Sequence, residues 1–307
     1  MILSIIIPTL NEEKYLPLLL ASIKKQDFKD YEIIVADAGS KDKTLEIAKK
    51  YKVRLTKGGL PAKGRNQGAK IAKGNIFLFL DAEAVLPEHF LKRVLLEFKE
   101  RKLGIASCGL EPITKNKAYR ILNDILYNWP VRLLENVFPY TSNFILVKRE
   151  IHEKIQGFDQ GITLGEDHAY GREAAKIAKF SFLRLSKLTL LPRRFEYEGW
   201  LTISAKYYFC NLYNIFFGNV RSNIFRYDLN SRSYIDTIAN QGSRAKREVL
   251  KKRKKKKKRP KLQRVIFTAL KSPIYIIWFV VGFATWLIIF LIFSPKLIVV
   301  YLKKKKK

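Results

Sequence analysis

Histidine, cysteine and methionine are scarce in this chain. Its 307 residues include three histidines, one methionine and two cysteines, Cys108 and Cys210, which lie far apart. This scarcity argues against a zinc site or a disulfide framework, because both need several such residues at characteristic spacings. The opening stretch MILSIIIPTLNEE has no basic start, and Pro8 and Asn11 interrupt its apolar run, so we expect no secretory signal peptide.

Acidic residues are outnumbered by basic ones, but the imbalance is local. The chain has 59 Lys and Arg against 27 Asp and Glu, a net charge of +32. Residues 244–264 hold fourteen Lys or Arg and one Glu, and residues 303–307 are all Lys. Between these blocks, residues 274–293 contain no charge, which is the length that crosses the hydrocarbon core of a bilayer. This pattern predicts a C-terminal membrane anchor with basic flanks that are attracted to anionic headgroups.

Two forms of anchor are compatible with the sequence, and a buried core helix is the alternative to both. A single transmembrane helix is our leading interpretation, and the basic block before it predicts a cytoplasmic catalytic domain. The Lys tail would then lie on the opposite side, whereas a hairpin anchor would keep both basic blocks inside. We therefore expect the chain at the cell membrane, with the domain boundaries 1–195 (catalytic), 196–230 (aromatic, amphipathic and interfacial), 231–263 (polybasic linker), 264–302 (anchor) and 303–307 (tail).

The first 80 residues alternate between buried strands and helices. Continuous apolar runs at 2–8, 31–37 and 75–81 predict strands covered on both faces, with helices between them. Asn11 is expected to cap the first helix. The fold class is therefore α/β, a Rossmann-like mixed sheet covered by helices, and ligands are expected at the carboxyl ends of its strands.

The following residues extend this pattern less regularly. Pro87 is expected in the first turn of a helix that ends near Arg101, and residues 104–110 predict a strand. Residues 115–140 are aromatic and amphipathic and are expected to form a helix that is broken at Pro130. The catalytic part is expected to close near Pro192.

Several charged residues fall at strand ends or helix starts, where chemistry is commonly placed. Asp81 and Glu83 follow a buried strand on either side of a small residue, so they could share a hard cation that bridges to a diphosphate. Asp37 ends the second strand, Arg65 could offer positive charge to phosphates, and the pair 166–167 (Glu-Asp) opens a helix. Each of these features alone is as compatible with a capped or solvated helix start as with a ligand site.

Their order along the chain is more informative. The blocks IIIPTLNEE, VADAGSKDKT, KGRNQGAKIAKGNIFLFLDAEAVLP and GFDQGITLGEDHAYGRE resemble family 2 glycosyltransferases of the GT-A fold, in order and in approximate spacing over residues 1–195. The resemblance implies a GT-A-type sheet and transfer of a sugar from a nucleoside-diphosphate donor (UDP- or GDP-linked) to a lipid-linked or other membrane-proximal glycan acceptor. It also implies Mg²⁺ or Mn²⁺ and an inverting single displacement.

The same resemblance implies a role for each candidate residue. Pro8, Thr9 and Glu12 would line the nucleotide pocket, Asp37 would hydrogen-bond the base, and Arg65 would lie near the diphosphate. Asp81 and Glu83 occupy the position of the family's DxD motif, with Glu where Asp is usual, so which of them holds the metal is left open. Asp167 would deprotonate the acceptor hydroxyl, with Glu166 in support.

Three other functions are compatible with parts of the sequence. A retaining GT-A enzyme shares the fold, and a nucleotidyltransferase would require a glycine-rich loop with arginine after the first strand, where this chain has TLNEE. A polybasic nucleic-acid or membrane-binding protein would be expected to interleave aromatic and basic residues, whereas KKRKKKKKRPK is uniform and adjoins the apolar segment. We therefore expect no nucleic-acid partner.

Overall fold

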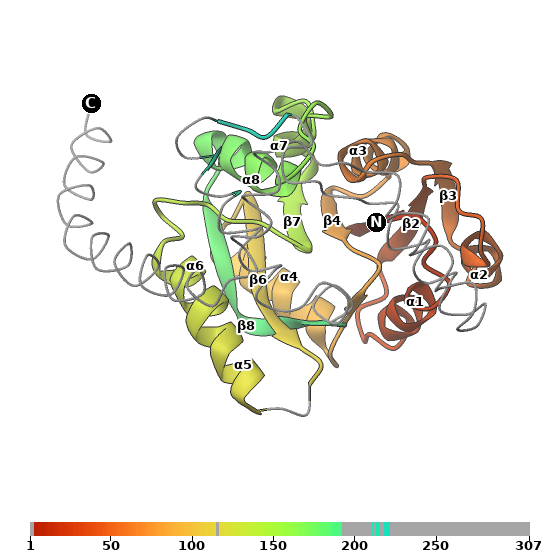
Figure 1. Cartoon of the computed structure of the whole chain (residues 1–307), viewed down its shortest axis with the longest axis horizontal. Helices are drawn as coiled ribbons and strands as arrows, with labels where there is room; N and C mark the ends of the chain where they lie inside the picture. The colour runs from red at the N-terminus through yellow and green to blue at the C-terminus, as the bar shows by residue number, and fades with distance from the viewer. Residues whose placement is uncertain (1–2, 115–116, 192–209, 211–212, 215–217, 222–307) are drawn as a thin grey trace, which may run out of the picture. The chain divides into compact units, whose positions relative to one another are not determined.

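The structure is a computed structural model that describes residues 3–114, 117–191, 210, 213–214 and 218–221 (Figure 1). Residues 1–193 and 213–227 form one compact unit, which contains nearly all of the described residues. The predicted polybasic linker, anchor and Lys tail, and most of the aromatic segment, lie outside the described residues. Within the described ranges, no helix combines the length and apolar character needed to cross a membrane.

The centre of the unit is an eight-stranded mixed sheet with the strand order β3-β2-β1-β4-β7-β6-β8-β5. Its strands are β1 (Leu3–Thr9), β2 (Tyr31–Asp37), β3 (Arg54–Lys57), β4 (Ile76–Leu80), β5 (Ala84–Val85), β6 (Ile105–Pro112), β7 (Phe144–Lys148) and β8 (Phe180–Leu190). The first four of the order are parallel, β7 runs antiparallel to β4 and β6, and β8 is parallel to β6. The expected mixed sheet is therefore confirmed.

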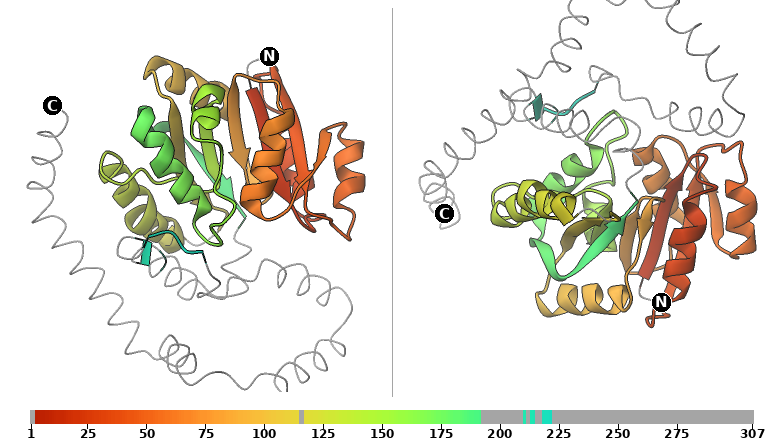
Figure 2. Two further views of the ribbon diagram at one scale, coloured as in Figure 1. Left: turned by 90° about the horizontal axis from the view of Figure 1, so that it is seen from above. Right: turned by 60° about the horizontal axis from the view of Figure 1, so that its bottom comes forward.

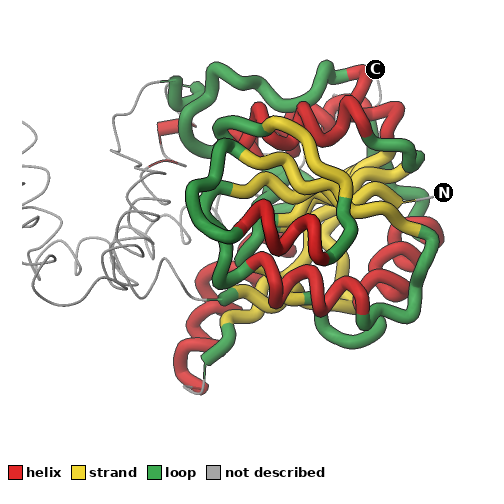
Figure 3. The backbone as a smooth tube through the Cα atoms, turned by 90° about the vertical axis from the view of Figure 1, so that its right-hand side faces the viewer, coloured by secondary structure: helices red, strands yellow, loops and turns green. Residues whose placement is uncertain are grey.

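Helices cover both faces of this sheet, as the tube view shows (Figure 3). The helices are α1 (Leu16–Lys24), α2 (Thr44–Lys50), α3 (Pro61–Ile71), α4 (Phe90–Glu100), α5 (Lys117–Asn123), α6 (Trp129–Leu133), α7 (Arg149–Lys154) and α8 (Glu166–Ile177), with a π-helical turn η1 (Asp124–Asn128) between α5 and α6. Buried side chains of α1 and α4 pack with one face of the strands, and those of α3, α7 and α8 pack with the other. This two-sided burial explains why the strands read as continuous apolar runs.

Two expected helix starts are wrong. Asn11 adopts a left-handed backbone conformation, and its side chain accepts a hydrogen bond from the Lys41 amide (Oδ1–N, 2.7 Å), so α1 begins later, at Leu16. Pro87 precedes α4 by three residues, because His89 also adopts a left-handed conformation and the helix begins at Phe90. In both cases the chain after the strand turns once more before it becomes helical.

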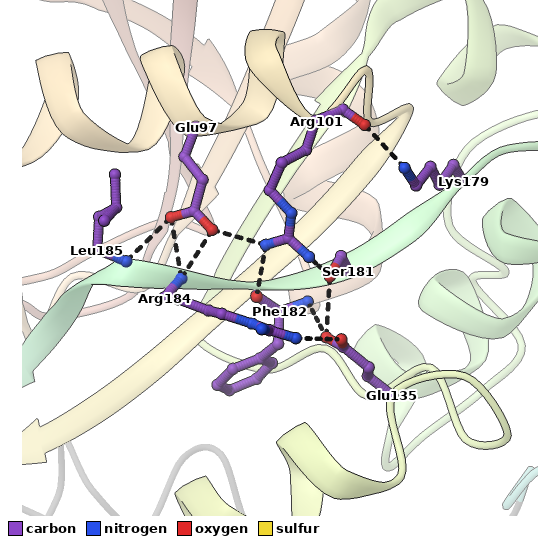
Figure 4. A network of polar contacts seen from close by, with 8 residues as sticks. All are labelled: Glu97, Arg101, Glu135, Lys179, Ser181, Phe182, Arg184 and Leu185. Atoms are coloured by element: carbon purple, nitrogen blue, oxygen red, sulfur yellow. Dashed lines mark hydrogen bonds and ion pairs between the residues drawn. The ribbon is translucent and has the colours of Figure 1, made fainter.

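Strand β8 was not predicted, and a bulge is its distinguishing feature. The pairing of β6 with β8 jumps from Cys108–Leu183 to Gly109–Lys187, so three residues of β8 have no partner in β6. Glu97 of α4 accepts hydrogen bonds at this point from the backbone amides of Arg184 (2.9 Å) and Leu185 (3.0 Å) (Figure 4). The buried Glu97 carboxylate thereby accepts hydrogen bonds from amides of β8 that have no partner in β6 at the bulge.

A second buried carboxylate holds the same strand from the segment after α6. Glu135 accepts hydrogen bonds from the Phe182 amide (2.6 Å) and the Ser181 hydroxyl (2.9 Å), and it pairs with Arg184 at 3.3 Å (Figure 4). Glu97 and Glu135 therefore attach α4 and the α6 segment to opposite sides of the bulged strand.

We expect Glu97→Ala to lower the free energy of unfolding by about 1–3 kcal/mol, because it removes the buried carboxylate that accepts hydrogen bonds from the Arg184 and Leu185 amides and from Arg101. Chemical denaturation monitored by circular dichroism measures this difference. Glu100→Ala, an exposed position on the same helix, is the matched control and should change stability by less than about 0.5 kcal/mol. Equal stability of the two variants would contradict the assigned role of Glu97.

Candidate active site

A buried arginine joins the acidic loop after β4 to the start of α8. Arg65 of α3 donates from Nη2 to Asp81 Oδ1 at 2.9 Å and from Nη1 to Glu166 Oε1 at 2.8 Å. Its side chain is only 4% exposed, compared with 27% for Asp81. The structure thus brings together three residues that the sequence places far apart: one on α3, one directly after β4 and one at the start of α8.

The electrostatics of this group follow from burial and charge. Burial alone would lower the pKa of Arg65, but the neighbouring carboxylates of Asp81 and Glu166 raise it, so the guanidinium keeps its charge. Burial and the nearby Asp167 carboxylate raise the pKa of Glu166 above its ordinary value of 4.5, against the opposing effect of Arg65. The guanidinium also lies 5.3 Å from the centre of the Phe158 ring, which contributes a cation–π contact.

Asp167 lies at the N-terminus of α8, directly after Glu166. Gly165 precedes the helix with φ of +77°, a backbone conformation that glycine adopts without the strain a Cβ would add. The Asp167 carboxylate accepts a hydrogen bond from the amide of His168 at 2.8 Å, and 20% of its side chain is exposed. It is therefore oriented by its own helix and accessible to an acceptor.

Two residues in the loop before β7 that contact the candidate site were missed by sequence reasoning. Asn143 donates from Nδ2 to Asp81 Oδ2 at 2.8 Å, while its carbonyl accepts a hydrogen bond from the Asp81 amide at 3.3 Å. Thr141 donates from its hydroxyl to the carbonyl oxygen of Asp167. The signal was the antiparallel pairing of β4 with β7, which places the residue before Phe144 opposite the residue after Leu80.

His168 and Asn66 have structural contacts. The ring of His168 packs against that of Tyr140 at a tilt of 31°, with centroids 3.9 Å apart, and its Nδ1 contacts the Thr141 carbonyl oxygen. Asn66 clamps Phe158, donating to its carbonyl and accepting from its amide, both at 2.8 Å. Neither side chain is needed to account for chemistry at the site.

A hollow of about 440 Å³ lies beside Asp37, at the carboxyl ends of β2 and β3. Its lining comprises Asp37, Ala38, Gly39, Leu45, Leu55, Thr56, Lys57 and Gly58. The Asp37 carboxylate accepts hydrogen bonds from Thr9 Oγ1 (3.1 Å) and from the Gly39 and Ser40 amides (2.9 and 2.8 Å). The lining combines apolar side chains with Thr56, Lys57 and one fixed carboxylate, which suits a planar base that offers an N–H.

The other two predicted nucleotide residues lie on the first strand and in the loop after it. Pro8 lies near the end of β1 and packs closely against Gly64 of α3. A side-chain Cβ added at Gly64 would lie only 3.1 Å from the Cβ of Pro8. Glu12 lies in the loop after β1, is buried, and donates its backbone amide to Thr44 Oγ1 at 2.7 Å. Together with Thr9, which is the β1 partner of Asp37, these residues lie at or just after the carboxyl end of β1.

The acidic loop has a donor set that fits a hard divalent ion. The Ala84 amide donates to the Asp81 carbonyl at 3.1 Å, which closes a turn with Glu83 near its end. Glu83 is 9% exposed, and its carbonyl accepts a hydrogen bond from the Leu191 amide at 3.1 Å, so the turn is fixed by the end of β8. Within the described part of the chain, no three acidic, histidine or cysteine side chains gather as a metal cage. Mg²⁺ is typically held by one or two carboxylates together with substrate phosphates, and Asp81 with Glu83 can supply that share.

Comparison with known proteins identifies the family. A model described as glycosyl transferase family 2 matches residues 4–159, half of the chain. The chain belongs to this family. The sheet, with its covering helices, is consistent with the GT-A fold.

Individual relatives of this family 2 chain cover parts of it. A poly(ribitol-phosphate) β-N-acetylglucosaminyltransferase, TarS of Staphylococcus aureus, is 40% identical over 99 residues, which are 29% of this chain and 17% of TarS. A Methanococcus voltae dolichyl N-acetyl-α-D-glucosaminyl phosphate 3-β-D-2,3-diacetamido-2,3-dideoxy-β-D-glucuronosyltransferase is 30% identical over 145 residues, 42% of this chain and 45% of the relative. The chain therefore spans less than half of the length of either protein.

Solved structures show the same fold. The crystal structure of S. aureus TarS residues 1–349 with UDP superposes with a TM-score of 0.52 at 26% identity, covering 67% of this chain and 64% of that one. The mannosyltransferase PcManGT from Pyrobaculum calidifontis, in complex with GDP-Man and Mn²⁺, superposes with a TM-score of 0.56 at 18% identity, covering 81% of this chain and 78% of that one.

Proposed function

We propose that this family 2 glycosyltransferase is a metal-dependent, inverting enzyme that transfers a sugar from a UDP- or GDP-linked donor to a lipid-linked or other membrane-proximal glycan acceptor. The observation that carries the proposal is the chain of contacts Asp81–Arg65–Glu166, which lies between the acidic loop and Asp167. It fixes a buried guanidinium between the loop that carries the candidate metal ligands Asp81 and Glu83 and the helix start that carries the accessible Asp167 carboxylate.

Different residues would bind the base, the diphosphate and the metal ion of the donor complex. The hollow beside Asp37 would hold the base, and Arg65, bonded to Asp81 and Glu166, would fix the acidic loop near the diphosphate. Asp81 and Glu83 would hold Mg²⁺ or Mn²⁺, which when bound neutralises negative charge on the departing diphosphate. Both Asp81 carboxylate oxygens already accept a hydrogen bond, from Arg65 and from Asn143, and the Glu83→Ala titration below assigns the share of metal ligation between Asp81 and Glu83.

In the transfer step Asp167 would accept the proton of the acceptor hydroxyl. The acceptor oxygen forms its bond to the anomeric carbon as the bond from that carbon to the diphosphate oxygen breaks, and the nucleoside diphosphate leaves with the electron pair. Glu166 is bonded to Arg65 at 2.8 Å, so we assign it to positioning the arginine rather than to proton transfer. The chain's contribution is then positioning and electrostatic stabilisation.

The relatives support these finer points without deciding them. The TarS structure contains UDP, the PcManGT structure contains GDP-Man and Mn²⁺, and the name of the M. voltae relative describes an acceptor carried on dolichyl phosphate. A lipid-linked acceptor also agrees with the predicted anchor and with a cytoplasmic catalytic domain at the cell membrane. Protease accessibility of residues 303–307 in sealed vesicles distinguishes a single-span anchor from a hairpin.

We expect Glu83→Ala to weaken Mn²⁺-dependent donor binding by about 100-fold, in keeping with the several kcal/mol that a metal ion contributes at such sites. Calorimetric titration of the full chain with UDP- and GDP-sugars, with and without Mn²⁺, measures this loss. Glu88→Ala, an exposed glutamate in the same connection, is the control and should bind as the unaltered protein does.

The same donor panel tests the function as a whole. Turnover of one nucleotide-sugar, with an inverted anomeric product by NMR, supports the proposal. A retained configuration would assign the retaining alternative, and absence of any nucleoside-diphosphate binding would refute the assignment as an enzyme. If Mn²⁺ still strengthens donor binding by Glu83→Ala as much as it does for the unaltered protein, Asp81 is the metal ligand.

A further inference from the structure

The helical segment 117–133 forms a rod at the edge of the domain (Figures 1 and 2). It joins α5, η1 and α6 without a break, contrary to the expected interruption at Pro130. The amide of Trp129 donates to the Asp124 carbonyl, five residues back, which is the π-helical pattern. Since a proline ring clashes with the carbonyl four residues before it in an α-helix, the wider turn lets the rod continue through Pro130.

Large apolar side chains form an exposed stripe along this rod. Ile121 is 59% exposed, Ile125 53%, Trp129 60% and Leu133 52%. Positions four apart drift by about 40° around an α-helix, and a π turn drifts in the opposite sense, so η1 keeps the four on one side. The stripe is therefore a built feature of the rod and not a scatter of exposed residues.

The other side of the rod is fixed to the domain. Asn128 is buried and bonds both backbone groups of Leu110, donating to the carbonyl at 2.8 Å and accepting from the amide at 2.9 Å. Tyr127 forms a hydrogen bond with Ser142 at 2.7 Å. Because one side is held this way, the apolar stripe is presented outward as a fixed surface.

The charges beside the stripe are predominantly basic. Lys117 and Arg120 are exposed, and the acidic Asp124 is paired with Lys187 at 2.7 Å. A helix with isoleucine, leucine and tryptophan on one side and basic residues beside them is typical of segments that lie in the headgroup region of a bilayer. Tryptophan is favoured there because its ring is apolar and its N–H is polar.

We propose that the stripe Ile121–Ile125–Trp129–Leu133 is a membrane-docking surface that lies in the headgroup region of an anionic bilayer. The polybasic block 244–264 and the uncharged segment 274–293 of the same chain favour this occupant over a protein partner. Docking deepens the proposed function, because the loop that the rod holds through Ser142 also contains Thr141, which bonds the Asp167 carbonyl, and Asn143, which bonds Asp81. A lipid-borne acceptor would then meet the site at the membrane surface.

Spin labels on the full chain test this surface directly. The chain is reconstituted into vesicles of phosphatidylcholine and phosphatidylglycerol, with a nitroxide attached in turn to Ile125→Cys and Trp129→Cys. Leu96→Cys is the matched control, since Leu96 is 50% exposed on α4 and equally apolar. The native Cys108 and Cys210 are buried, which limits background labelling.

The ratio of oxygen to nickel-chelate accessibility should be several-fold higher at positions 125 and 129 than at position 96. Equal ratios at the three positions overturn the proposal. So does dipolar broadening between labels at 129, which would indicate a second copy on the stripe, or shielding of position 129 from both reagents, which would indicate a protein segment there. The measurement uses neither donor nor acceptor, so its failure leaves the proposed transfer reaction standing, and the reverse also holds.

Discussion

Asp167→Asn is expected to lower kcat for a hydroxyl acceptor by about 10²–10⁴-fold, the usual contribution of a general base. The substitution keeps the shape of the side chain and its hydrogen bond from the His168 amide, since an Asn oxygen also accepts at 2.8 Å. Donor affinity should change little, because Asp167 is not among the residues that line the hollow beside Asp37. Initial rates together with calorimetric donor titrations separate the two quantities.

The control for Asp167 lies on the same helix. Glu173→Gln removes an exposed carboxylate that pairs with Lys176 at the surface, and its kcat should match that of the unaltered enzyme. The size of the loss also reports the acceptor class, because a phosphate acceptor is already ionised and needs no base. Full activity of Asp167→Asn toward a hydroxyl acceptor would exclude the assigned role.

Arg65→Met is expected to destabilise the domain by about 3–5 kcal/mol and to abolish transfer. Removing one member of a buried ion pair leaves the others as uncompensated charges. Glu166 and Asp81 would then face the site without the guanidinium that now bonds both. Arg65→Lys should be intermediate, because a lysine ammonium cannot bridge two carboxylates with a planar fork.

The loss in Arg65→Met should depend on pH in a defined direction. Burial and Asp167 already raise the pKa of Glu166 in the folded protein, and removal of Arg65 takes away the opposing effect. A raised folded-state pKa means that the native state binds protons more readily than the unfolded state, so stability falls as the pH rises above the ordinary Glu value of 4.5. The deficit of the variant should therefore narrow as the pH is lowered toward that value.

Urea denaturation at several pH values measures this trend. Arg93→Met, an exposed arginine on α4, is the control and should cost less than about 1 kcal/mol at every pH. A variant at Arg65 that is as stable as the control, or whose deficit grows on acidification, would contradict the electrostatic account.

Strands whose two faces are both covered were predictable from the sequence. Continuous apolar runs identified β1, β2 and β4 within one or two residues at each end, because burial on both faces leaves no room for polar alternation. Strand β8 was not predicted because its sequence shows neither a continuous apolar run nor a regular alternation. Its bulge shifts the alternation partway along, so no single period describes Phe180–Leu190.

The site residues divide in a similar way. Asp37, Arg65, Asp81 and the pair 166–167 could be proposed because each occupies a strand end or a helix start. Asn143 could not, since its role depends on the antiparallel neighbour of β4, which only the folded sheet reveals. Glu97 and Glu135 look like surface glutamates in the sequence, and only their contacts with β8 explain why they are buried. The anchor and the interfacial segment stay predictions.

The two partners of Arg65 lie 16 and 101 positions away along the chain. The contact with Glu166 closes a loop of about 100 residues, so it costs more chain entropy to form than the contact with Asp81. During synthesis, a nascent chain that has not yet reached residue 166 cannot supply the second carboxylate. The Asp81–Arg65–Glu166 arrangement is therefore completed only after α8 has been synthesised, and until then the Arg65 guanidinium has Asp81 as its partner.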